Sequence, residues 1–388
     1  MTVRTKGVDG DGPFLPDEIL AQGDVVRRVA EIEPQIAEVA EEVYRRGVRD
    51  VVMTGCGDSL FAAMAARHAF SGFSRWLTHA MHALEYARDF YRTSDRDTLV
   101  CALSYGGETR RTLEAAIGAR YRGAQVLAIS VDKRGPIPQL ADHFLPNVAP
   151  LERSNCRTGS FQAAYLELYL LAAHLAAQRG ELDDAQLALV RGDLAELETV
   201  LHDFASEIRG RATEVAHMIR TAGHVHYLGG GEAHAATLYG AAKLDETSSI
   251  PTLPQDTEQF AHEAIFSLEP DSLVIVTALS GPFYERAVQV ADAVRTIGAP
   301  TIGIGDDGAF ASHVDQFIET PRLASGRFGM SIAVVPMQWM ALADALARGS
   351  DPDRVRHKNV NSPLIREIPI WSEDDYRRHD PQGELLRG

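Results

Sequence analysis

Short apolar runs alternate with longer amphipathic stretches along most of this 388-residue chain. Six runs of five or six residues end at glycine or another polar position, and most of them lead into a stretch with helical spacing. The runs are Asp50–Thr54, Thr98–Leu103, Gln125–Ser130, His224–Leu228, Leu273–Thr277 and Thr301–Gly305. Apolar strands that alternate with helices indicate β-α-β units, and therefore a mostly parallel sheet with helices on both faces.

The second half of the chain repeats the plan of the first. Gly55 and Gly229 each end the first apolar run of their half and lie 174 residues apart, which suggests duplication of one domain. We therefore predict an α/β fold of two similar doubly wound, flavodoxin-like domains with parallel sheets. The long polar region Leu182–Ile219 is predicted to be helical, with the domain boundary near Gly210. The predicted parts are an N-terminal arm (1–24), a first domain (25–209), a second domain (210–350) and a C-terminal tail (351–388).

The segments outside the sheets have patterns of their own. The arm up to about Gln22 is predicted to be irregular, whereas Val25–Arg46 has apolar residues every three or four positions and is predicted to be one amphipathic helix. The longest apolar run, Ala163–Ala177, is interrupted by Glu167 and His174 and is expected to be a buried helix. No run reaches the roughly 20 residues of a membrane span, and no signal peptide is expected.

Acidic residues outnumber basic ones, 54 to 38, which gives a formal charge of −16. A field of this sign repels nucleic acid and anionic membranes, so neither is expected as a partner. A small anionic substrate remains compatible, because a few local donors outweigh a net field that is screened over about 10 Å. Cys56, Cys101 and Cys156 form no Cys-x-x-Cys motif, so reduced cysteines and a cytoplasmic location are expected. No His/Cys/Asp cluster has metal-ligand spacing, so no metal or other cofactor is expected.

Glycine-rich turns follow the first two strands of the first half. Gly55-Cys-Gly57-Asp-Ser59 and Ser104-Tyr-Gly-Gly-Glu-Thr109 each lead from a strand into a helix. Such turns direct backbone N–H groups and the positive end of a helix at one spot, which suits an anion. Ligands of parallel sheets bind at the carboxyl ends of strands. Either loop alone is equally consistent with ordinary turn chemistry, but two of them in adjacent units favour a ligand site.

A dinucleotide site is the competing interpretation of these glycines. Leu60 stands where the third glycine of G-x-G-x-x-G is required, and no acidic residue ends a strand about 20 residues after Gly57. In the second half, Gly229-Gly-Gly231 does not complete the pattern either. A Walker A loop is absent from the sequence. The sequence therefore argues against a nucleotide cofactor.

Together these segments resemble the tandem sugar isomerase (SIS) domain family, and the isomerase half of glucosamine-6-phosphate synthase in particular. The family's Gly-x-Gly-Thr-Ser turn and Ser-x-Ser-Gly-Glu-Thr loop are similar to the two turns above, and its Ser-Thr-Lys-x-Phe stretch is similar to Arg157-Thr-Gly-Ser-Phe161. The resemblance extends over roughly residues 51–353 and implies that these turns bind a sugar phosphate. The binding residues that it implies are Gly57, Asp58, Ser59, Ser104, Tyr105, Gly106, Gly107, Thr109, Arg157 and Gly231.

The same resemblance implies a catalytic set in the second half. Lys243, Glu246 and His262 reproduce the spacing of the synthase's Lys-x-x-Glu and of its His, 16 residues after the Glu. In the family the carboxylate moves a proton between C1 and C2, and the histidine, contributed by the neighbouring subunit, assists ring opening or protonates a leaving group. Proton transfer next to a carbonyl needs such a pair of acid–base groups. The alternative is a solvated i,i+3 ion pair and an unrelated surface histidine.

Three substitutions relative to the family pattern bear on the anion. Gly106 and Asp58 replace hydroxyl-bearing residues of the two loops, which removes donors and adds a carboxylate. Arg157 replaces a serine, and its guanidinium either restores anion binding or pairs with Asp58 or Glu152. We therefore expect an anionic sugar substrate, whose anion is either phosphate or another group.

The ends of the chain also differ from the synthase. Lys358 lies near the place of the synthase's catalytic tail lysine but two residues out of register, and deglycase-type members lack that lysine. Residues 359–388 have no counterpart in the family, which leaves a lid, a subunit contact or a simple tail as alternatives. Met1-Thr2-Val3 supplies no N-terminal cysteine nucleophile, so no glutaminase half is expected.

These observations lead to one function and two rivals. The leading hypothesis is an aldose–ketose or amino-sugar isomerase, or deaminase, that performs 1,2-proton transfer on an open-chain sugar phosphate. The resemblance also implies a homodimer, with His262 contributed across its interface. The close rival is a deglycase that cleaves a fructosamine-type conjugate, because Asp256–His262 resembles the Glu-Phe-x-His stretch of such enzymes. A sugar-phosphate-binding regulatory module is the rival from another class, and the lack of a basic helix-turn-helix segment argues against it.

Overall fold

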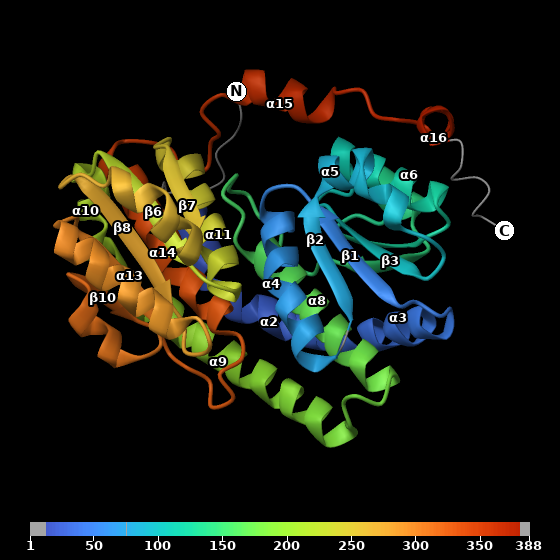
Figure 1. The fold of residues 1–388 in the computed structure, drawn as a ribbon, viewed down its shortest axis with the longest axis horizontal. Coiled ribbons are helices and arrows are strands. Elements are labelled where there is room, and N and C mark those ends of the chain that lie inside the picture. Colours follow the sequence, from blue (N-terminus) through green and yellow to red (C-terminus); the bar gives the residue numbers. More distant parts are fainter. Residues whose placement is uncertain (1–12, 75, 381–388) are drawn as a thin grey trace. The chain divides into compact units, whose positions relative to one another are not determined.

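The computed structural model describes residues 13–74 and 76–380, so the first half of the predicted N-terminal arm and the last eight tail residues lie outside the described chain. The described residues form two compact units. The first-sheet unit comprises residues 26–150, 160–192 and 357–380. The second-sheet unit comprises residues 13–25, 151–159 and 193–356. Both units are therefore built from separate stretches of the chain (Figure 1).

The elements alternate between strand and helix in both halves, as the apolar runs predict. In chain order they are α1 (Leu15–Leu20), α2 (Gln22–Glu31), α3 (Glu33–Arg45), β1 (Asp50–Gly55), α4 (Asp58–Phe73), β2 (Leu77–His82), α5 (Ala83–Arg88), η1 (Phe90–Thr93), β3 (Thr98–Leu103), α6 (Arg110–Tyr121), β4 (Gln125–Ser130), α7 (Pro136–Leu140), β5 (His143–Pro146), α8 (Gly159–Gln178), α9 (Asp184–Val215), α10 (His217–Thr221), β6 (His224–Gly229), α11 (Glu232–Ser248), β7 (Thr252–Asp256), α12 (Thr257–His262), η2 (Ala264–Ser267), β8 (Ser272–Ala278), α13 (Tyr284–Ile297), β9 (Thr301–Gly305), η3 (Gly308–His313), β10 (Gln316–Glu319), α14 (Gly329–Ala347), α15 (Lys358–Arg366) and α16 (Glu373–His379).

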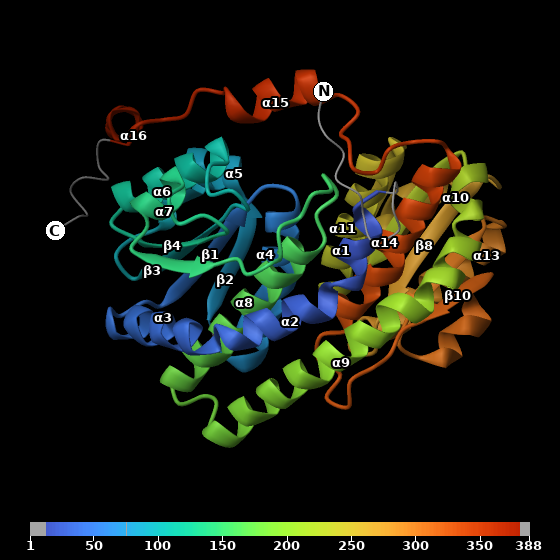
Figure 2. The ribbon, with the colours of Figure 1, turned by 180° about the vertical axis from the view of Figure 1, so that it is seen from behind.

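The first sheet is parallel throughout and has the order β2-β1-β3-β4-β5. Its inner strands β3 and β4 are buried at every residue, because helices cover both faces of the sheet. Helices α5, α6 and α7 pack on one face, and α3 and α8 lie on the other (Figure 2). The predicted helix at 163–177 lies within α8 and is buried, as expected.

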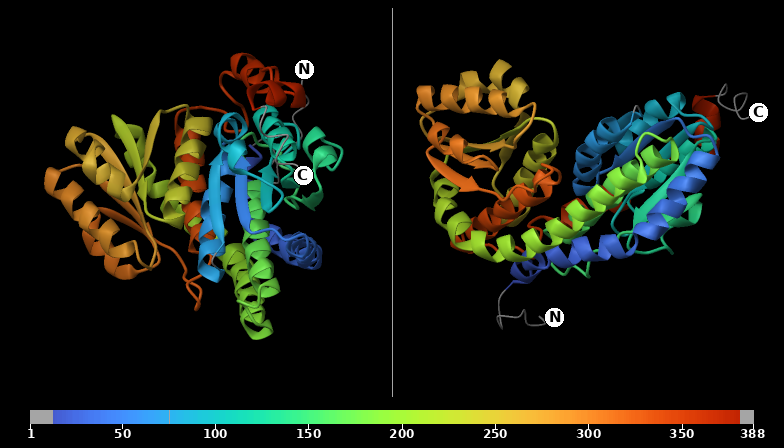
Figure 3. Two further views of the ribbon diagram at one scale, coloured as in Figure 1. Left: turned by 45° about the vertical axis from the view of Figure 1, so that its right-hand side comes forward. Right: turned by 90° about the horizontal axis from the view of Figure 1, so that it is seen from below.

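The second sheet has the order β10-β9-β8-β6-β7 and is also parallel. Read from its other edge, the order is β7-β6-β8-β9-β10, which corresponds strand by strand to β2-β1-β3-β4-β5 of the first sheet. Helices again lie on both faces (Figure 3), with α12 and α13 packed in the core of one face and α11 packed against α14. The predicted fold class, two doubly wound flavodoxin-like domains, is confirmed.

Four predictions about local structure are wrong. The arm is helical from Leu15 in the described part, because Leu15 and Ile19 are fully buried. The predicted single helix 25–46 is two helices that meet at Ile32, just before Pro34. The edge strands β2 and β7 were not predicted, because their residues are half exposed and lack an apolar run. Helix α14 is longer and more apolar than 163–177 and has the length and composition of a membrane span. Most of it is buried inside the protein, as in a core helix.

Candidate functional site

The glycine turns of the first sheet lie side by side at its carboxyl edge. Strands β1 and β3 are paired neighbours, with Thr54 opposite Ala102, and the strand order reverses between them. Ligands of doubly wound sheets bind at this reversal point. Gly57 precedes α4 with φ 56° and ψ −131°, a conformation that residues with a side chain rarely adopt. A Cβ atom at Gly57 would meet nothing within 4 Å, so the space above this turn is open.

The second loop of this edge, residues 104–109, presents two hydroxyl groups next to one another. The Ser104 and Thr109 hydroxyl oxygens are 2.8 Å apart, and the Thr109 backbone N–H donates to the Ser104 hydroxyl. Gly107 has φ 70°, and a Cβ there would press on Pro138 and Ser130 at 3.1 Å. The Tyr105 carbonyl accepts from the Val131 N–H. The loop is therefore held by the neighbouring strand end while its hydroxyls stay at the edge.

Helix α6 connects the two loops. It begins directly after Thr109 of the second loop, and Cys56 of the first turn packs against the buried core that α6 helps to form. Burial raises the pKa of the Cys56 thiol above its usual value, so this cysteine is a neutral structural group rather than a nucleophile. Helix α6 is thus connected to both predicted anion loops.

Asp58, Ser59 and Gly106 lie at the same edge. Asp58 is the first residue of α4, where the family pattern has a residue with a hydroxyl group. Its negative carboxylate therefore lies at the positive end of the helix dipole. Asp58 and Ser59 are half-buried, and Gly106 adds no side chain to the second loop. The donors at this edge are therefore the hydroxyls and the backbone N–H groups at the starts of α4 and α6.

Arg157 lies in the second-sheet unit, whereas the two loops belong to the first-sheet unit. Its guanidinium donates to the Glu152 carbonyl at 2.8 Å and lies 4.0 Å from the Glu152 carboxylate. The Tyr239 hydroxyl donates to the Arg157 carbonyl at 2.8 Å. This geometry is the one expected if Arg157 pairs with Glu152, and a role in anion binding remains a prediction.

Lys243 and Glu246 form an ion pair of unequal burial on α11. The Lys243 ammonium lies 2.8 Å from a Glu246 carboxylate oxygen and 4.9 Å from the centre of the Tyr239 ring. The Lys243 side chain is 0% exposed, whereas that of Glu246 is 37% exposed. A solvated surface pair would expose both partners, so the burial of Lys243 argues against that part of the alternative, and the catalytic role of the pair remains a prediction. A buried ammonium is costly unless it is paired, so the lysine requires the carboxylate and fixes its direction.

His262 ends α12 and is 71% exposed. Its Nε2 atom lies 2.9 Å from Glu258, which also binds Arg286 at 2.5 Å; these two hydrogen bonds hold the pKa of the Glu258 carboxyl below its usual value. No hydrogen bond or ion pair joins His262 to Glu246 within the described chain. Asp245, beside Glu246, accepts a hydrogen bond from Thr252, the first residue of β7, whereas His262 ends the helix that follows the last residue of β7.

Lys358 is the first residue of α15 in the first-sheet unit. Its predicted catalytic role remains a prediction.

Glu232 is a titratable residue that the sequence analysis did not single out. It is the first residue of α11, and burial raises the pKa of its carboxyl from 4.5 to about 7. An acidic residue in the first turn of a helix is common because it complements the helix dipole, so the sequence gives no signal of this burial. About 14 residues of helix, or roughly 21 Å, separate it from Glu246, so the two carboxyls act independently.

At the carboxyl edge of the second sheet, side chains of the protein occupy the glycine turn and the Ser280 donors, beside a hollow of about 530 Å³ lined by Ser280, Asp307 and Arg322 among others. Gly231 has φ 62° and ψ −127°, nearly the conformation of Gly57, but a Cβ there would meet the ring of Phe283. After β8, the backbone N–H and the hydroxyl of Ser280 both donate to Asp306, at 2.7 and 2.8 Å. A carboxylate of the chain therefore satisfies the donors that an anionic ligand would need at this edge.

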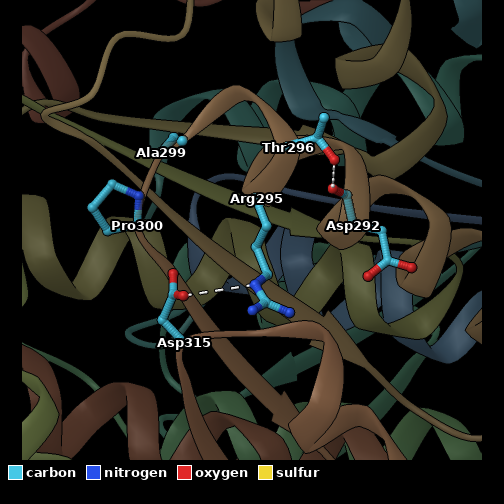
Figure 4. Close-up of a pocket in the computed structure, with 7 residues that line it drawn as sticks. Asp292, Arg295, Thr296, Ala299, Pro300 and Asp315 are labelled. Carbon is cyan, nitrogen blue, oxygen red and sulfur yellow. Dashed lines mark hydrogen bonds and ion pairs between the residues drawn. The ribbon is translucent and has the colours of Figure 1, made fainter.

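A surface hollow of about 660 Å³ lies at the opposite, amino edge of the second sheet (Figure 4). Arg295 points into it and lies 3.6 Å from Asp315, while the Thr296 hydroxyl donates to the Asp292 carbonyl. Asp315 also accepts from the N–H and hydroxyl of Thr301. The polar groups of this hollow are thus paired with one another, and it lies away from the strand ends where ligands bind. Within residues 13–74 and 76–380, no group of three or more His, Cys, Asp or Glu side chains is placed to hold a metal ion.

The SIS domain family model matches residues 46–175 and 218–321, more than half of the chain, and the chain therefore belongs to this family. A glutamine–fructose-6-phosphate aminotransferase [isomerizing] of Streptomyces coelicolor is 28% identical over 364 residues, covering 90% of this chain and 54% of the relative. The chain thus spans about half the length of such curated relatives.

Solved structures share the fold at lower identity. The C-terminal domain of glucosamine-fructose-6-phosphate aminotransferase from Francisella tularensis has a TM-score of 0.82 at 18% identity, covering 90% of this chain and all of that domain. A putative tagatose-6-phosphate ketose/aldose isomerase from Clostridium novyi has a TM-score of 0.77 at 14% identity, covering 93% of this chain and 95% of the other.

Proposed function

We propose that this SIS-family chain is an enzyme that transfers a proton between C1 and C2 of an open-chain sugar phosphate, with Glu246 as the base. Membership of the family and the names of its relatives, which act on fructose 6-phosphate or are described as ketose/aldose isomerases, support this reaction class. The observation that carries the assignment of the base is the pair of a fully buried Lys243 and a half-exposed Glu246.

The pair suits a base because it combines access with a fixed direction. A base must reach the proton on carbon next to the carbonyl, so its carboxylate needs an open side. The same carboxylate must not rotate freely, because effective proton transfer depends on orientation. The Glu246 side chain is 37% exposed to solvent, and its carboxylate is hydrogen-bonded to Lys243.

The phosphate of the substrate is assigned to the carboxyl edge of the first sheet. The hydroxyls of Ser59, Ser104 and Thr109 and the N–H groups at the starts of α4 and α6 supply neutral donors, and two helix N-termini supply positive potential. The carboxylate of Asp58 lowers this potential. We therefore expect phosphate to bind more weakly here than in relatives that carry a threonine at this position.

His262 is assigned to ring opening or to protonation of the leaving group, from a second copy of the chain. Its exposed position and its lack of a bond to Glu246 support a role outside its own subunit. The surface around it includes the edge strand β7, with Leu253 46% exposed, and Phe266, which is 82% exposed. An exposed strand edge beside apolar side chains is the type of surface that proteins cover by association.

A deglycase is the second candidate. Lys358 lies two residues away from the position of the synthase's catalytic tail lysine, which deglycase-type members lack, and this favours a deglycase over a synthase-like mechanism. A deglycase would use Glu246 as base and His262 as acid, and would release a free amino acid from a fructosamine-type conjugate. An isomerase would exchange hydrogen at C1 or C2 without releasing an amine. Product analysis by NMR therefore separates the two reactions.

The proposal is tested with Glu246→Gln. Loss of a general base lowers turnover by roughly 10²–10⁴-fold, while the amide oxygen of glutamine still accepts a hydrogen bond from Lys243 and preserves the fold. Asp245→Asn is the matched control, because it removes a neighbouring carboxylate that bonds Thr252 rather than Lys243. If Glu246→Gln kept more than about a tenth of wild-type turnover, Glu246 would not be the base.

A further inference from the structure

Residues 368–380, which we call the C-terminal clamp, pack against helices α5 and α6 of the first-sheet unit (Figures 1 and 2). The Trp371 ring lies between the Arg88 guanidinium, 4.0 Å from the ring centre, and the stacked ring of His379 at 4.3 Å. Tyr376 is fully buried in the core on this face of the sheet. Its hydroxyl donates to the carbonyls of Ala87 and Glu114.

The clamp follows the whole length of α6. Gly118 has no room for a Cβ atom, which would meet Tyr376 within 3 Å. At the end of the helix, the Tyr121 hydroxyl donates to the Asp380 carbonyl at 2.7 Å, and Arg122 lies 3.1 Å from the Asp380 carboxylate. A segment held by buried aromatic rings and an ion pair of low exposure is an integral part of the domain rather than a loose tail.

The other end of the clamp reaches the first turn of α6. Arg110 donates to the Ile368 carbonyl and Arg111 to the Pro369 carbonyl, both at 3.2 Å. The buried carboxylate of Glu114 accepts from the Trp371 N–H at 2.9 Å. It is also paired with Arg88 at 2.7 Å and Arg111 at 2.5 Å. A buried carboxylate needs all of its partners, so the position of α6 depends on the clamp.

Helix α6 is connected to both anion loops. Thr109, immediately before Arg110, is bonded to Ser104 of the second loop, and Cys56 of the first loop packs against the buried core that α6 helps to form. A displacement of α6 along its axis therefore moves donors of both loops at once.

We propose that the C-terminal clamp sets the position of the two anion loops through α6, with Trp371 as a positioning residue for substrate binding. This rests on the proposed function in that the loops are taken to bind the substrate's phosphate. Trp371 touches neither loop and acts through Arg88, Glu114 and the first turn of α6. Residues 368–380, which have no counterpart in the family, thereby act in substrate binding.

The test is the affinity of the full-length protein for inorganic phosphate, measured by calorimetry at a temperature well below unfolding. Trp371→Ala is expected to weaken phosphate binding about tenfold, because small misplacements of binding groups cost one to two orders of magnitude. Trp371→Phe keeps an aromatic face for Arg88 and is expected to retain most of the affinity. Tyr121→Phe loosens the far end of the clamp and is expected to weaken binding in the same direction.

Val43→Ala is the matched control. It creates a cavity under α3 in the same unit, away from α6, and lowers the melting temperature without moving the loops. The clamp proposal is overturned if Trp371→Ala and Tyr121→Phe bind phosphate as tightly as the wild type, or if Val43→Ala loses as much affinity as Trp371→Ala. Failure of the wild-type protein itself to bind phosphate would overturn the proposed anion site, and the clamp with it.

Discussion

The two sheets have the same strand order and nearly the same glycine turn, yet their carboxyl edges differ. At the first edge the space above Gly57 is open and the hydroxyls of Ser104 and Thr109 face one another. At the second edge, Phe283 covers the corresponding turn and Asp306 occupies the donors of Ser280. The comparison teaches that the fold offers a glycine turn in each sheet, and that side chains from distant loops decide which of the two turns is open.

In the proposed mechanism the second-sheet unit contributes through Lys243 and Glu246 of α11 rather than through its strand ends, and Lys243→Met tests this directly. Turnover is expected to fall about 100-fold, because Glu246 loses the group that orients it. The free energy of unfolding should stay the same or rise, since a methionine in place of a buried ammonium leaves behind only a partly exposed carboxylate. The measurement is steady-state kinetics together with chemical denaturation; unchanged kinetics would remove Lys243 from the mechanism.

A raised pKa at the second edge should appear in the pH dependence of stability. Between pH 4.5 and about 7 the unfolded chain ionises Glu232 while the folded protein keeps it neutral, so stability falls as pH rises through this window. Glu232→Gln should reduce this fall by on the order of 2 kcal/mol after allowing for partial solvent access. Chemical denaturation at several pH values measures the free energy of unfolding as a function of pH. If this free energy depended on pH in the same way for Glu232→Gln and the wild type, Glu232 would ionise normally in the folded protein.

The matched serines of the two edges should behave differently. Ser104→Ala is expected to weaken phosphate binding about tenfold, because a hydrogen bond to a charged group contributes about 1.5 kcal/mol or more. Ser280→Ala should leave phosphate affinity unchanged and affect stability alone, since its hydroxyl bonds Asp306. Calorimetry on both variants provides the comparison. Equal losses of affinity would mean that both edges bind anions.

The smallest expected effect is that of Phe283→Ala. Removing the ring opens the second turn, but the Asp306 carboxylate still repels an anion and still holds Ser280. The number of phosphates bound per chain should therefore stay as in the wild type. Binding of an additional phosphate would show that the ring alone closes the second edge.

The inner strands could be predicted from the sequence because they are buried on both faces and form continuous apolar runs, as in β3 and β4. The edge strands could not, because no residue of β2 or β7 is fully buried and neither strand forms an apolar run. Helix α14 was missed as an element because Pro336 lies within it and reads as a helix breaker, although the helix accommodates it in the core.

For the candidate site, spacing identified Lys243 and Glu246 but could not reveal that one is buried and the other is open, which is the feature that argues for a base. Long-range contacts were invisible as well. The packing of Phe283 on Gly231 joins residues about fifty positions apart, and that of Tyr376 on Gly118 joins residues over 250 positions apart. No local pattern in the sequence records either contact.

The central claim is proton transfer between C1 and C2 by Glu246, and solvent deuterium exchange tests it most directly. Wild-type protein is incubated in D₂O with a sugar phosphate that a thermal-shift screen shows to bind, and the sugar is followed by NMR. The account predicts deuterium at C1 or C2 with the wild type and almost none with Glu246→Gln, while Asp245→Asn exchanges normally. Equal exchange by wild type and Glu246→Gln, or no exchange of any bound sugar phosphate by the wild type, would contradict it.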